Sequence, residues 1–250
     1  MKYFIITGAS KGLGEGIGLE LAKNKNHLFV VSRTESEQVK KLALDNGCGY
    51  SYIPFDLAYS HNTPHLARII FEQIPLENAT GVYLVNNAGI LEPVGRAESC
   101  NADAVEHHIH INLLAPMLLS SAFIQLTSAW PIQKRILNIS SGAAVNPYWG
   151  WSSYCTGKAG LDMYTRCVAL EQSTQPHPIE IMAVAPGIID TSMQEFIRNT
   201  TDEQFLDRKK FVEFKESGML VHPHDAGKRI AALLISDEFY NGAVVDLRKK

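Results

Sequence analysis

Short apolar runs and helical patterns alternate along almost the whole of this chain. Runs typical of buried strands cover residues 2–7, 28–32, 50–54, 82–85, 135–139, 179–184 and 242–246. A first helical pattern ends near residue 22, and further patterns cover residues 35–46, 64–73, 101–128, 152–172 and 225–236. Pro116 is expected to bend the longest of these helices or to start a second segment. Because such alternation builds a parallel sheet with helices on both faces, the sequence predicts one doubly wound α/β domain over residues 1–250.

The composition excludes several other classes of protein. Hydrophobic residues make up 46% of the 250 and charged residues 20%, which is typical of a folded domain rather than a disordered chain. The net charge of −3 indicates no surface for nucleic acid, and no run predicts a membrane span or a secretory signal. The four cysteines form no CxxC pair, so reduced thiols and a cytoplasmic location are expected.

A glycine-rich turn joins the first strand to the first helix. It reads Thr7-Gly8-Ala9-Ser10-Lys11-Gly12-Leu13-Gly14. Glycines at such a turn let the pyrophosphate of a dinucleotide approach backbone amides at a helix N-terminus, which carries partial positive charge. The spacing is G-x-x-x-G-x-G rather than G-x-G-x-x-G, so an ordinary strand–helix turn is the alternative interpretation.

Two cations indicate which dinucleotide would fit. In NAD-type sites an acidic residue near the end of the second strand binds the ribose hydroxyl, but this chain has Ser32-Arg33 there. A guanidinium can bind a 2′-phosphate with two hydrogen bonds, and Lys11 in the glycine-rich turn supplies a second cation. Either cation alone is more often a surface charge. The pair together favours NADP(H).

A hydroxyl, a phenol and an amine lie close together between residues 140 and 158. Tyr154 and Lys158 are four residues apart, so they share one face of the predicted helix. Ser140 and Ser141 directly follow the fifth strand and can complete a site from the edge of the sheet. A free phenol titrates near pH 10, and a cation one helical turn away is expected to lower that pKa. These residue types suit acid–base catalysis with Tyr154 as the group that transfers the proton.

Six motifs occur together in the order and spacing of one enzyme family. They are Thr7-Gly8-x-x-x-Gly12-x-Gly14, Asn86-Asn87-Ala88-Gly89, Asn112, Ser141, Tyr154-x-x-x-Lys158 and Pro186-Gly187-x-x-x-Thr191. In these motifs, which cover nearly the whole chain, the sequence resembles the short-chain dehydrogenase/reductase family. The resemblance implies a Rossmann-type sheet of about seven strands in the order 3-2-1-4-5-6-7.

The resemblance also implies a role for each motif. The catalytic residues would be Asn112, Ser141, Tyr154 and Lys158, with Ser141 on the substrate carbonyl and Asn112 holding a water that links Lys158 to solvent. Lys158 would also hold the nicotinamide ribose. The implied cofactor-binding residues are Gly8, Ser10, Lys11, Gly12, Leu13, Gly14, Arg33, Asp56, Leu57, Asn86, Ala88, Gly89, Tyr154, Lys158, Pro186, Gly187, Ile188 and Thr191. The alternative to these roles is that the strand-end residues only form ordinary turns and that Asn112 only packs within its helix.

The substrate class is the most open question. Four stretches resemble bacterial benzil reductases that form (S)-benzoin, and sepiapterin reductases: His110-Ile-Asn-Leu-Leu-Ala-Pro-Met, Asn138-Ile-Ser-Ser-Gly-Ala, Tyr154-Cys-Thr-x-Lys158-Ala-Gly and Ala185-Pro-Gly. The resemblance implies an NADPH-dependent ketone reductase acting on an aromatic α-diketone such as benzil. Tyr148, Trp149 and Trp151 suit a flat aromatic substrate, although they suit dimer contacts equally well. Met193 lies in a lid predicted over residues 188–221, whose alternative is a surface insertion.

The sequence is also compatible with several other interpretations. A pterin-side-chain, quinone or hydroxysteroid reductase would use the same residues, whereas a catalytically silent NADP-binding sensor would not need all of them. His107, His108 and His110 have metal-like spacing, but no carboxylate or thiol completes a site, so surface or packing positions and no metal are expected. The only expected partner besides a small carbonyl substrate is a second copy, because the family commonly pairs through the helices at about 101–128 and 152–172.

Overall fold

Seven parallel strands form the centre of the molecule. The computed structural model describes residues 1–248, so Lys249 and Lys250 at the end of the predicted domain lie outside the described residues. The strands are β1 (Lys2–Thr7), β2 (Asn26–Ser32), β3 (Gly49–Pro54), β4 (Gly81–Asn86), β5 (Gln133–Ile139), β6 (Glu180–Ala185) and β7 (Val244–Asp246). They pair in parallel in the order β3-β2-β1-β4-β5-β6-β7. This order confirms the predicted doubly wound, Rossmann-type sheet.

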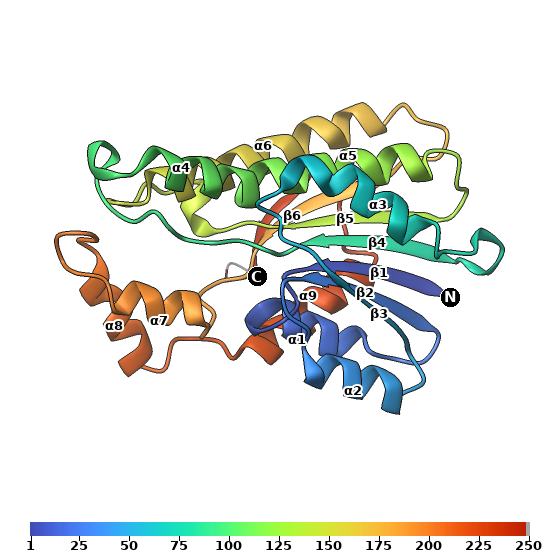
Figure 1. Cartoon of the computed structure of the whole chain (residues 1–250), viewed down its shortest axis with the longest axis horizontal. Helices are drawn as coiled ribbons and strands as arrows, with labels where there is room; N and C mark the ends of the chain where they lie inside the picture. The colour runs from blue at the N-terminus through green and yellow to red at the C-terminus, as the bar shows by residue number, and fades with distance from the viewer. Residues whose placement is uncertain (249–250) are drawn as a thin grey trace.

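Helices cover both faces of this sheet (Figure 1). One layer contains α1 (Gly12–Leu21), α2 (Glu37–Asp45) and α9 (Pro223–Ile235), and the other contains α3 (Thr63–Phe71), α4 (Ala102–Ile109), α5 (Ala115–Thr127) and α6 (Ser152–Gln172). Successive residues of β1 serve the two layers in turn: Phe4 and Ile6 belong to the core with α1 and α9, and Tyr3 and Ile5 to the core with α3 and α5. Burial on both faces explains why the strands are apolar runs.

The long helix predicted over residues 101–128 consists of two helices joined by a wider turn. A π-helical turn, His110–Leu114, separates α4 from α5, and Pro116 stands in the first turn of α5. Proline has no amide hydrogen, so it cannot donate to the carbonyl of Asn112 four residues earlier, as an α-helix requires. The expected bend near Pro116 therefore takes the form of a π turn that contains Asn112.

By length and composition alone, the run Ala102–Thr127 could cross a membrane. The sequence analysis expected no such run. Core helices meet the same criterion of length and composition, and α5 packs Leu119 and Phe123 into the core beneath it. This helix is therefore explained by its position over the sheet.

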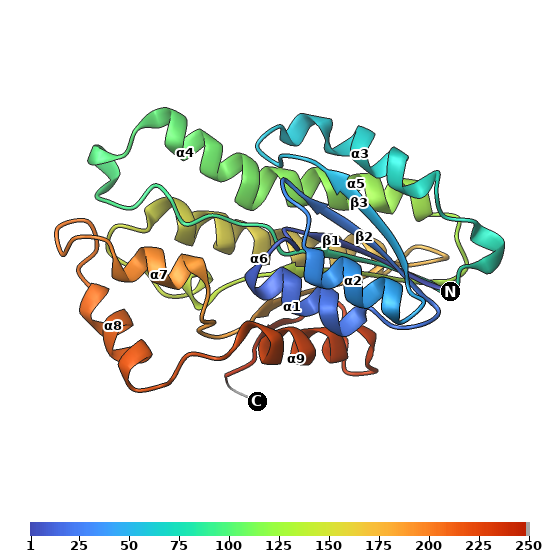
Figure 2. The same cartoon turned by 60° about the horizontal axis from the view of Figure 1, so that its bottom comes forward.

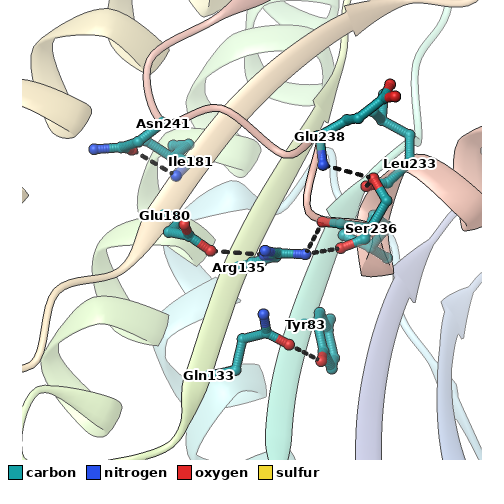
Figure 3. Close-up of polar contacts among 10 residues, drawn as sticks. Tyr83, Gln133, Arg135, Glu180, Ile181, Leu233, Ser236, Glu238 and Asn241 are labelled. Carbon is teal, nitrogen blue, oxygen red and sulfur yellow. Dashed lines mark hydrogen bonds and ion pairs between the residues drawn. The ribbon is translucent and has the colours of Figure 1, made fainter.

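A buried arginine ties the sheet to the end of α9, at the edge where β5 begins. Arg135 Nε donates to Glu180 Oε2 at 2.7 Å, and Nη1 donates to the carbonyl oxygens of Leu234 at 2.9 Å and Ser236 at 2.8 Å. Figure 3 shows the guanidinium between β6 and the C-terminus of α9. The last carbonyls of a helix lack partners within the helix, and Arg135 supplies donors for two at this end. The amino ends of β5 and β6 are thereby fixed, and their carboxyl ends are left for the site.

Two short helices form an excursion beyond the sheet (Figure 2), α7 (Ser192–Arg198) and α8 (Arg208–Glu216). A parallel bridge between Ile189 and Val221 closes its base: Asp190 N donates to Val221 O at 3.0 Å, and Val221 N donates to Ile188 O at 2.9 Å. Residues 188–221, called the lid segment below, thus leave the domain and return to it at the same point.

Candidate active site

A cavity of about 690 Å³ lies at the carboxyl ends of the strands, between the sheet and the lid segment. This is the place where doubly wound sheets bind ligands. Three predicted site residues are not in the cavity wall: Asn86, Asn112 and Trp149. All the others line it: Gly8, Ser10, Lys11, Gly12, Leu13, Gly14, Arg33, Asp56, Leu57, Ala88, Gly89, Ser141, Tyr148, Tyr154, Lys158, Pro186, Gly187, Ile188, Thr191 and Met193. The fold therefore brings together segments that are far apart in the sequence.

The glycine-rich turn is held tightly against the end of β4. Gly8 has a φ of +69°, and a Cβ there would lie 2.8 Å from the Cα of Ala88. A Cβ on Gly14 would lie 2.3 Å from the carbonyl oxygen of Gly8. Real Cβ atoms do not approach backbone so closely, so both positions require glycine. The close packing keeps the backbone amides of the turn at the cavity wall.

Asn87, which the sequence analysis did not select, holds this turn in place. Its Nδ2 donates to the carbonyl oxygens of Thr7 at 2.9 Å and Gly8 at 3.1 Å. The Thr7 hydroxyl oxygen in turn accepts from the backbone N–H groups of Asn87 and Ala88, at 3.0 and 3.1 Å. Asn86, its predicted neighbour, is instead buried and donates to Ser120 and Asn138 between β4, β5 and α5. Alternation along a strand sends the two side chains to opposite sides, which is the signal that could have separated them.

The N-terminus of α1 faces the cavity without a side-chain cap. Lys11 occupies the cap position in an extended conformation, and Gly12, Leu13 and Gly14 of the first turn line the cavity. The first amides of a helix have no partners within the helix, so these groups are available to a phosphate. Arg33 is exposed at the end of β2 and also borders the cavity.

Tyr154, Ser141 and Lys158 meet at the other half of the cavity. Tyr154 and Lys158 come from successive turns of α6, and Ser141 follows β5. The Ser141 hydroxyl lies within reach of the Tyr154 hydroxyl, whereas Ser140 lies near Asp162. Lys158 Nζ donates to the carbonyl oxygen of Ile139 at 2.8 Å and lies 5.9 Å from the centre of the Tyr154 ring. The prediction that Ser141 rather than Ser140 accompanies the tyrosine agrees with this geometry.

Burial controls the charges of the phenol and the amine. It raises the pKa of Tyr154, and the hydrogen bond with Ser141 only partly opposes this rise. Burial also lowers the pKa of Lys158 to about 8, against the charge of Asp162, which raises it. The expectation that Lys158 lowers the pKa of Tyr154 is therefore not met. The Lys158 ammonium is bonded to a backbone carbonyl over the face of the ring instead of to the phenol oxygen.

Asn112 lies directly behind the cavity, in the π turn between α4 and α5. Its side chain is fully buried and binds the backbone N–H and C=O groups of Ile90. Oδ1 accepts from Ile90 N at 2.9 Å, and Nδ2 donates to Ile90 O at 2.7 Å. Gly89 separates it from the lysine, because a Cβ there would lie 2.8 Å from Asn112 Oδ1 and 3.6 Å from Lys158 Nζ. Asn112 and Lys158 therefore lie close together, although only Lys158 borders the cavity.

Aromatic rings form the wall opposite the glycine-rich turn. The Trp151 and Phe205 rings are stacked at 4.5 Å with an angle of 2°, and Phe211 contacts both edge-on. Tyr148, Trp151 and Met193, all named in the sequence analysis, line this part of the cavity, but Trp149 does not. Trp151 is the residue that packs against Tyr154 immediately before α6. The lining residues that the sequence analysis did not select include Lys210, Phe211, Phe214 and Arg248, which no sequence motif marks.

The site contains the hydroxyl groups of Ser141 and Tyr154, the buried amine of Lys158 and the free backbone amides at the N-terminus of α1. This set can orient and protonate a carbonyl oxygen beside a bound dinucleotide. Within residues 1–248 no group of three or more His, Cys, Asp or Glu side chains is placed to hold a metal ion.

Comparison with known proteins agrees with this geometry. The sequence matches the short chain dehydrogenase family over residues 2–202. A benzil reductase from Bacillus cereus, which forms (S)-benzoin, is 41% identical over 98% of each chain, and a sepiapterin reductase from Bos taurus is 29% identical over 97% of this chain and 92% of its own. The crystal structure of the KRED1-Pglu enzyme has a TM-score of 0.81 at 29% identity, covering 98% of this chain and 100% of that one. The chain belongs to the short-chain dehydrogenase family and is an oxidoreductase that acts on CH–OH or C=O groups.

Proposed function

We propose that this protein is an NADPH-dependent carbonyl reductase that acts on aromatic α-diketones, such as benzil, and forms (S)-benzoin. One observation carries the proposal: the Tyr154–Ser141 pair and Lys158 lie in a single cavity between an uncapped helix N-terminus and an aromatic wall. The identity of 41% with a benzil reductase over nearly the full length supports the same substrate class.

The residues at the glycine-rich turn fit a dinucleotide with a 2′-phosphate. Gly8 and Gly14 leave no room for side chains where the backbone amides face the cavity, and Arg33 and Lys11 add positive charge at its edge. A guanidinium binds phosphate oxygens in pairs, which is why Arg33 is the residue expected to favour NADPH over NADH. When bound, this cofactor supplies the hydride for the carbonyl carbon.

Tyr154 is the proton donor for the carbonyl oxygen. Because its pKa is raised, the phenol keeps its proton at neutral pH, as reduction requires. The Ser141 hydroxyl lies beside it and can donate to the same carbonyl oxygen, which fixes and polarises the substrate. Lys158, with a pKa of about 8, exchanges protons close to neutral pH and can restore the proton on Tyr154 after each turnover.

The aromatic wall favours a flat apolar substrate. Trp151, Phe211 and Met193 line the cavity with Tyr154, and the buried Phe205 ring stacks on Trp151 without lining the cavity itself. Aromatic rings bind one another edge-on or offset-stacked, and Trp151 makes both kinds of contact, stacked with Phe205 and edge-on with Phe211. A diketone with a phenyl group on each carbonyl carbon matches such a wall better than an aliphatic ketone.

The test is turnover of benzil, sepiapterin and a simple aliphatic ketone, followed as loss of NADPH absorbance. Benzil should be reduced with the highest kcat/KM, and chiral chromatography should show (S)-benzoin. Tyr154→Phe should lower kcat by about 10²- to 10⁴-fold, the usual contribution of a general acid. Reduction of none of the carbonyl compounds, with tight NADPH binding, would identify a silent sensor and refute the proposal.

Arg33 provides a separate test of the cofactor. Arg33→Ala should raise the KM for NADPH about 10- to 100-fold, because charge-assisted hydrogen bonds contribute about 1.5–3 kcal/mol. The KM for NADH should change little, since NADH has no 2′-phosphate. Equal use of both cofactors by the unmodified protein would contradict the assignment of NADPH.

A further inference from the structure

An arginine enters the cavity from the last strand of the sheet, and neither the family motifs nor the proposed chemistry gives it a role. Arg248 comes two residues after the end of β7, at the same carboxyl edge of the sheet as Ser141, which follows β5. Its side chain lines the cavity, and 48% of the side-chain surface is exposed. The guanidinium is therefore accessible to a molecule bound in the cavity.

The backbone next to Arg248 is fixed to the core of the domain. Leu247 is buried, and its N–H group donates to the carbonyl oxygen of Ala185, the last residue of β6, at 3.0 Å. The carbonyl oxygen of Leu247 accepts from Arg229 Nη2 on α9 at 2.7 Å. The side chain of Arg248 thus extends from an anchored part of the cavity wall.

One aspartate and two glycines determine where the side chain of Arg248 lies. Asp246, at the end of β7, accepts from Nε at 3.0 Å through Oδ1 and from Nη2 at 2.6 Å through Oδ2, which is a two-point contact. A Cβ at Gly187 would lie 3.2 Å from Arg248 Cγ, and a Cβ at Gly142 would lie 2.9 Å from Arg248 Nη2. The side chain therefore lies across these two glycines, and the guanidinium reaches the residue that directly follows Ser141.

The contact with Asp246 leaves Arg248 with free donors but little net charge. A guanidinium has five N–H groups, and within residues 1–248 Nη1 makes no hydrogen bond. The hydrogen bond with Asp246 raises the pKa of Arg248, with a smaller contribution from the nearby Tyr148, so the donors keep their protons. A carboxylate or phosphate of a substrate would be repelled by Asp246, whereas a neutral carbonyl oxygen can accept from the free N–H groups. The pair is thus suited to a neutral acceptor.

We propose that Arg248 determines the preference for 1,2-dicarbonyl substrates by donating to the second carbonyl oxygen, the one that is not reduced. The proposal rests on the carbonyl reductase function proposed above, in which Ser141 and Tyr154 bind the oxygen that is reduced. The two carbonyl carbons of a 1,2-dicarbonyl are bonded to each other, so a second donor must lie beside the first pair, as Arg248 does at Gly142. Without this donor, the second oxygen would lose its hydrogen bonds to water on entering the cavity. A ketone with one carbonyl group gains nothing from Arg248.

Benzil and deoxybenzoin (1,2-diphenylethanone) are matched substrates, because they differ only in the second carbonyl group. Arg248→Met should lower kcat/KM for benzil about 10- to 100-fold, as expected for a lost hydrogen bond to a charged group, and leave kcat/KM for deoxybenzoin within about twofold. Arg248→Lys keeps the charge without the two-point contact and should give an intermediate ratio of the two values. Lys210→Met removes another cation of the cavity wall and should leave that ratio unchanged. Circular dichroism and the Kd for NADPH should be the same in all variants.

Failure of this proposal differs from failure of the function. If the wild type reduces benzil, then equal losses for both ketones in Arg248→Met, no loss for benzil, or the same change of ratio in Lys210→Met would each overturn the role of Arg248. A wild type that reduces neither ketone would refute the function. Equilibrium dialysis of both ketones against protein loaded with NADP⁺ then tests Arg248 by itself. Arg248→Met should weaken the binding of benzil alone, and equal binding of benzil by variant and wild type would overturn the proposal.

Discussion

Lys134 and Lys158 are both buried lysines, associated with opposite ends of β5. Lys134 is 2% exposed, and its Nζ donates to the carbonyl oxygens of Thr127 at 2.9 Å and His177 at 2.7 Å. Lys158 is 5% exposed, and its Nζ donates to the carbonyl oxygen of Ile139 at 2.8 Å. Burial lowers the pKa of both. Residue type, burial and pKa direction therefore do not distinguish a catalytic lysine from a structural one.

The surroundings distinguish them. Lys134 joins the end of α5 to the segment before β6, and within residues 1–248 it bonds only backbone carbonyls. Lys158 borders the cavity, lies over the Tyr154 ring and is one helical turn from Asp162. Asp162 is a buried carboxylate whose Oδ1 has no hydrogen-bond partner in the described part of the chain. A perturbed pKa indicates a functional site only together with a cavity and a chemical partner.

The largest expected effect is on turnover. Lys158→Met should lower kcat by about 10²- to 10⁴-fold, because the proton supply to Tyr154 is lost. Lys134→Met removes a lysine of the same size and burial and should leave kcat within about twofold. Steady-state kinetics with benzil at saturating NADPH measures both. Similar losses in the two variants would mean that the comparison reflects stability alone.

For the free energy of unfolding, the larger loss is expected in Lys134→Met rather than in Lys158→Met. Lys134→Met leaves the carbonyls of Thr127 and His177 without their donor and should lower the free energy of unfolding by about 1–3 kcal/mol. Lys158→Met removes the donor of one carbonyl, that of Ile139, and should lower it by less. Urea denaturation followed by circular dichroism gives both values. A larger loss in Lys158→Met would contradict the structural role assigned to Lys134.

The smallest effect is a shift in pH dependence. The ammonium form of Lys158 is present below its pKa of about 8 and is lost above it, so kcat should fall as the pH rises through this value. Asp162 raises that pKa, so Asp162→Asn should move the alkaline decline to lower pH. The profile of Lys134→Met should match that of the wild type. An unmoved decline in Asp162→Asn would show that Lys158 does not set it.

The sheet and the lining of its carboxyl edge could be predicted because they follow from local patterns. Strand alternation determines the layers, and the glycine spacing marks a turn that only small residues can form. The π turn around Asn112 could not be read from Pro116 alone, because a missing amide hydrogen permits a kink, a break or a wider turn. The absence of Trp149 from the cavity wall and the contribution of Phe211 to it depend on how the lid segment folds back, which no short-range pattern specifies.

The bridge between Ile189 and Val221 has a consequence for engineering and divergence. Since both ends of the lid segment are fastened at one point, its interior can be lengthened, shortened or replaced without changing the register of the sheet. The entropy of closing such a loop grows only with the logarithm of its length. Phe205, Phe211 and Met193 all lie inside the segment, whereas Tyr154 and Lys158 lie outside it. The lid segment therefore supplies an exchangeable part of the cavity wall, whereas the reacting residues belong to the part of the domain that such changes leave in place.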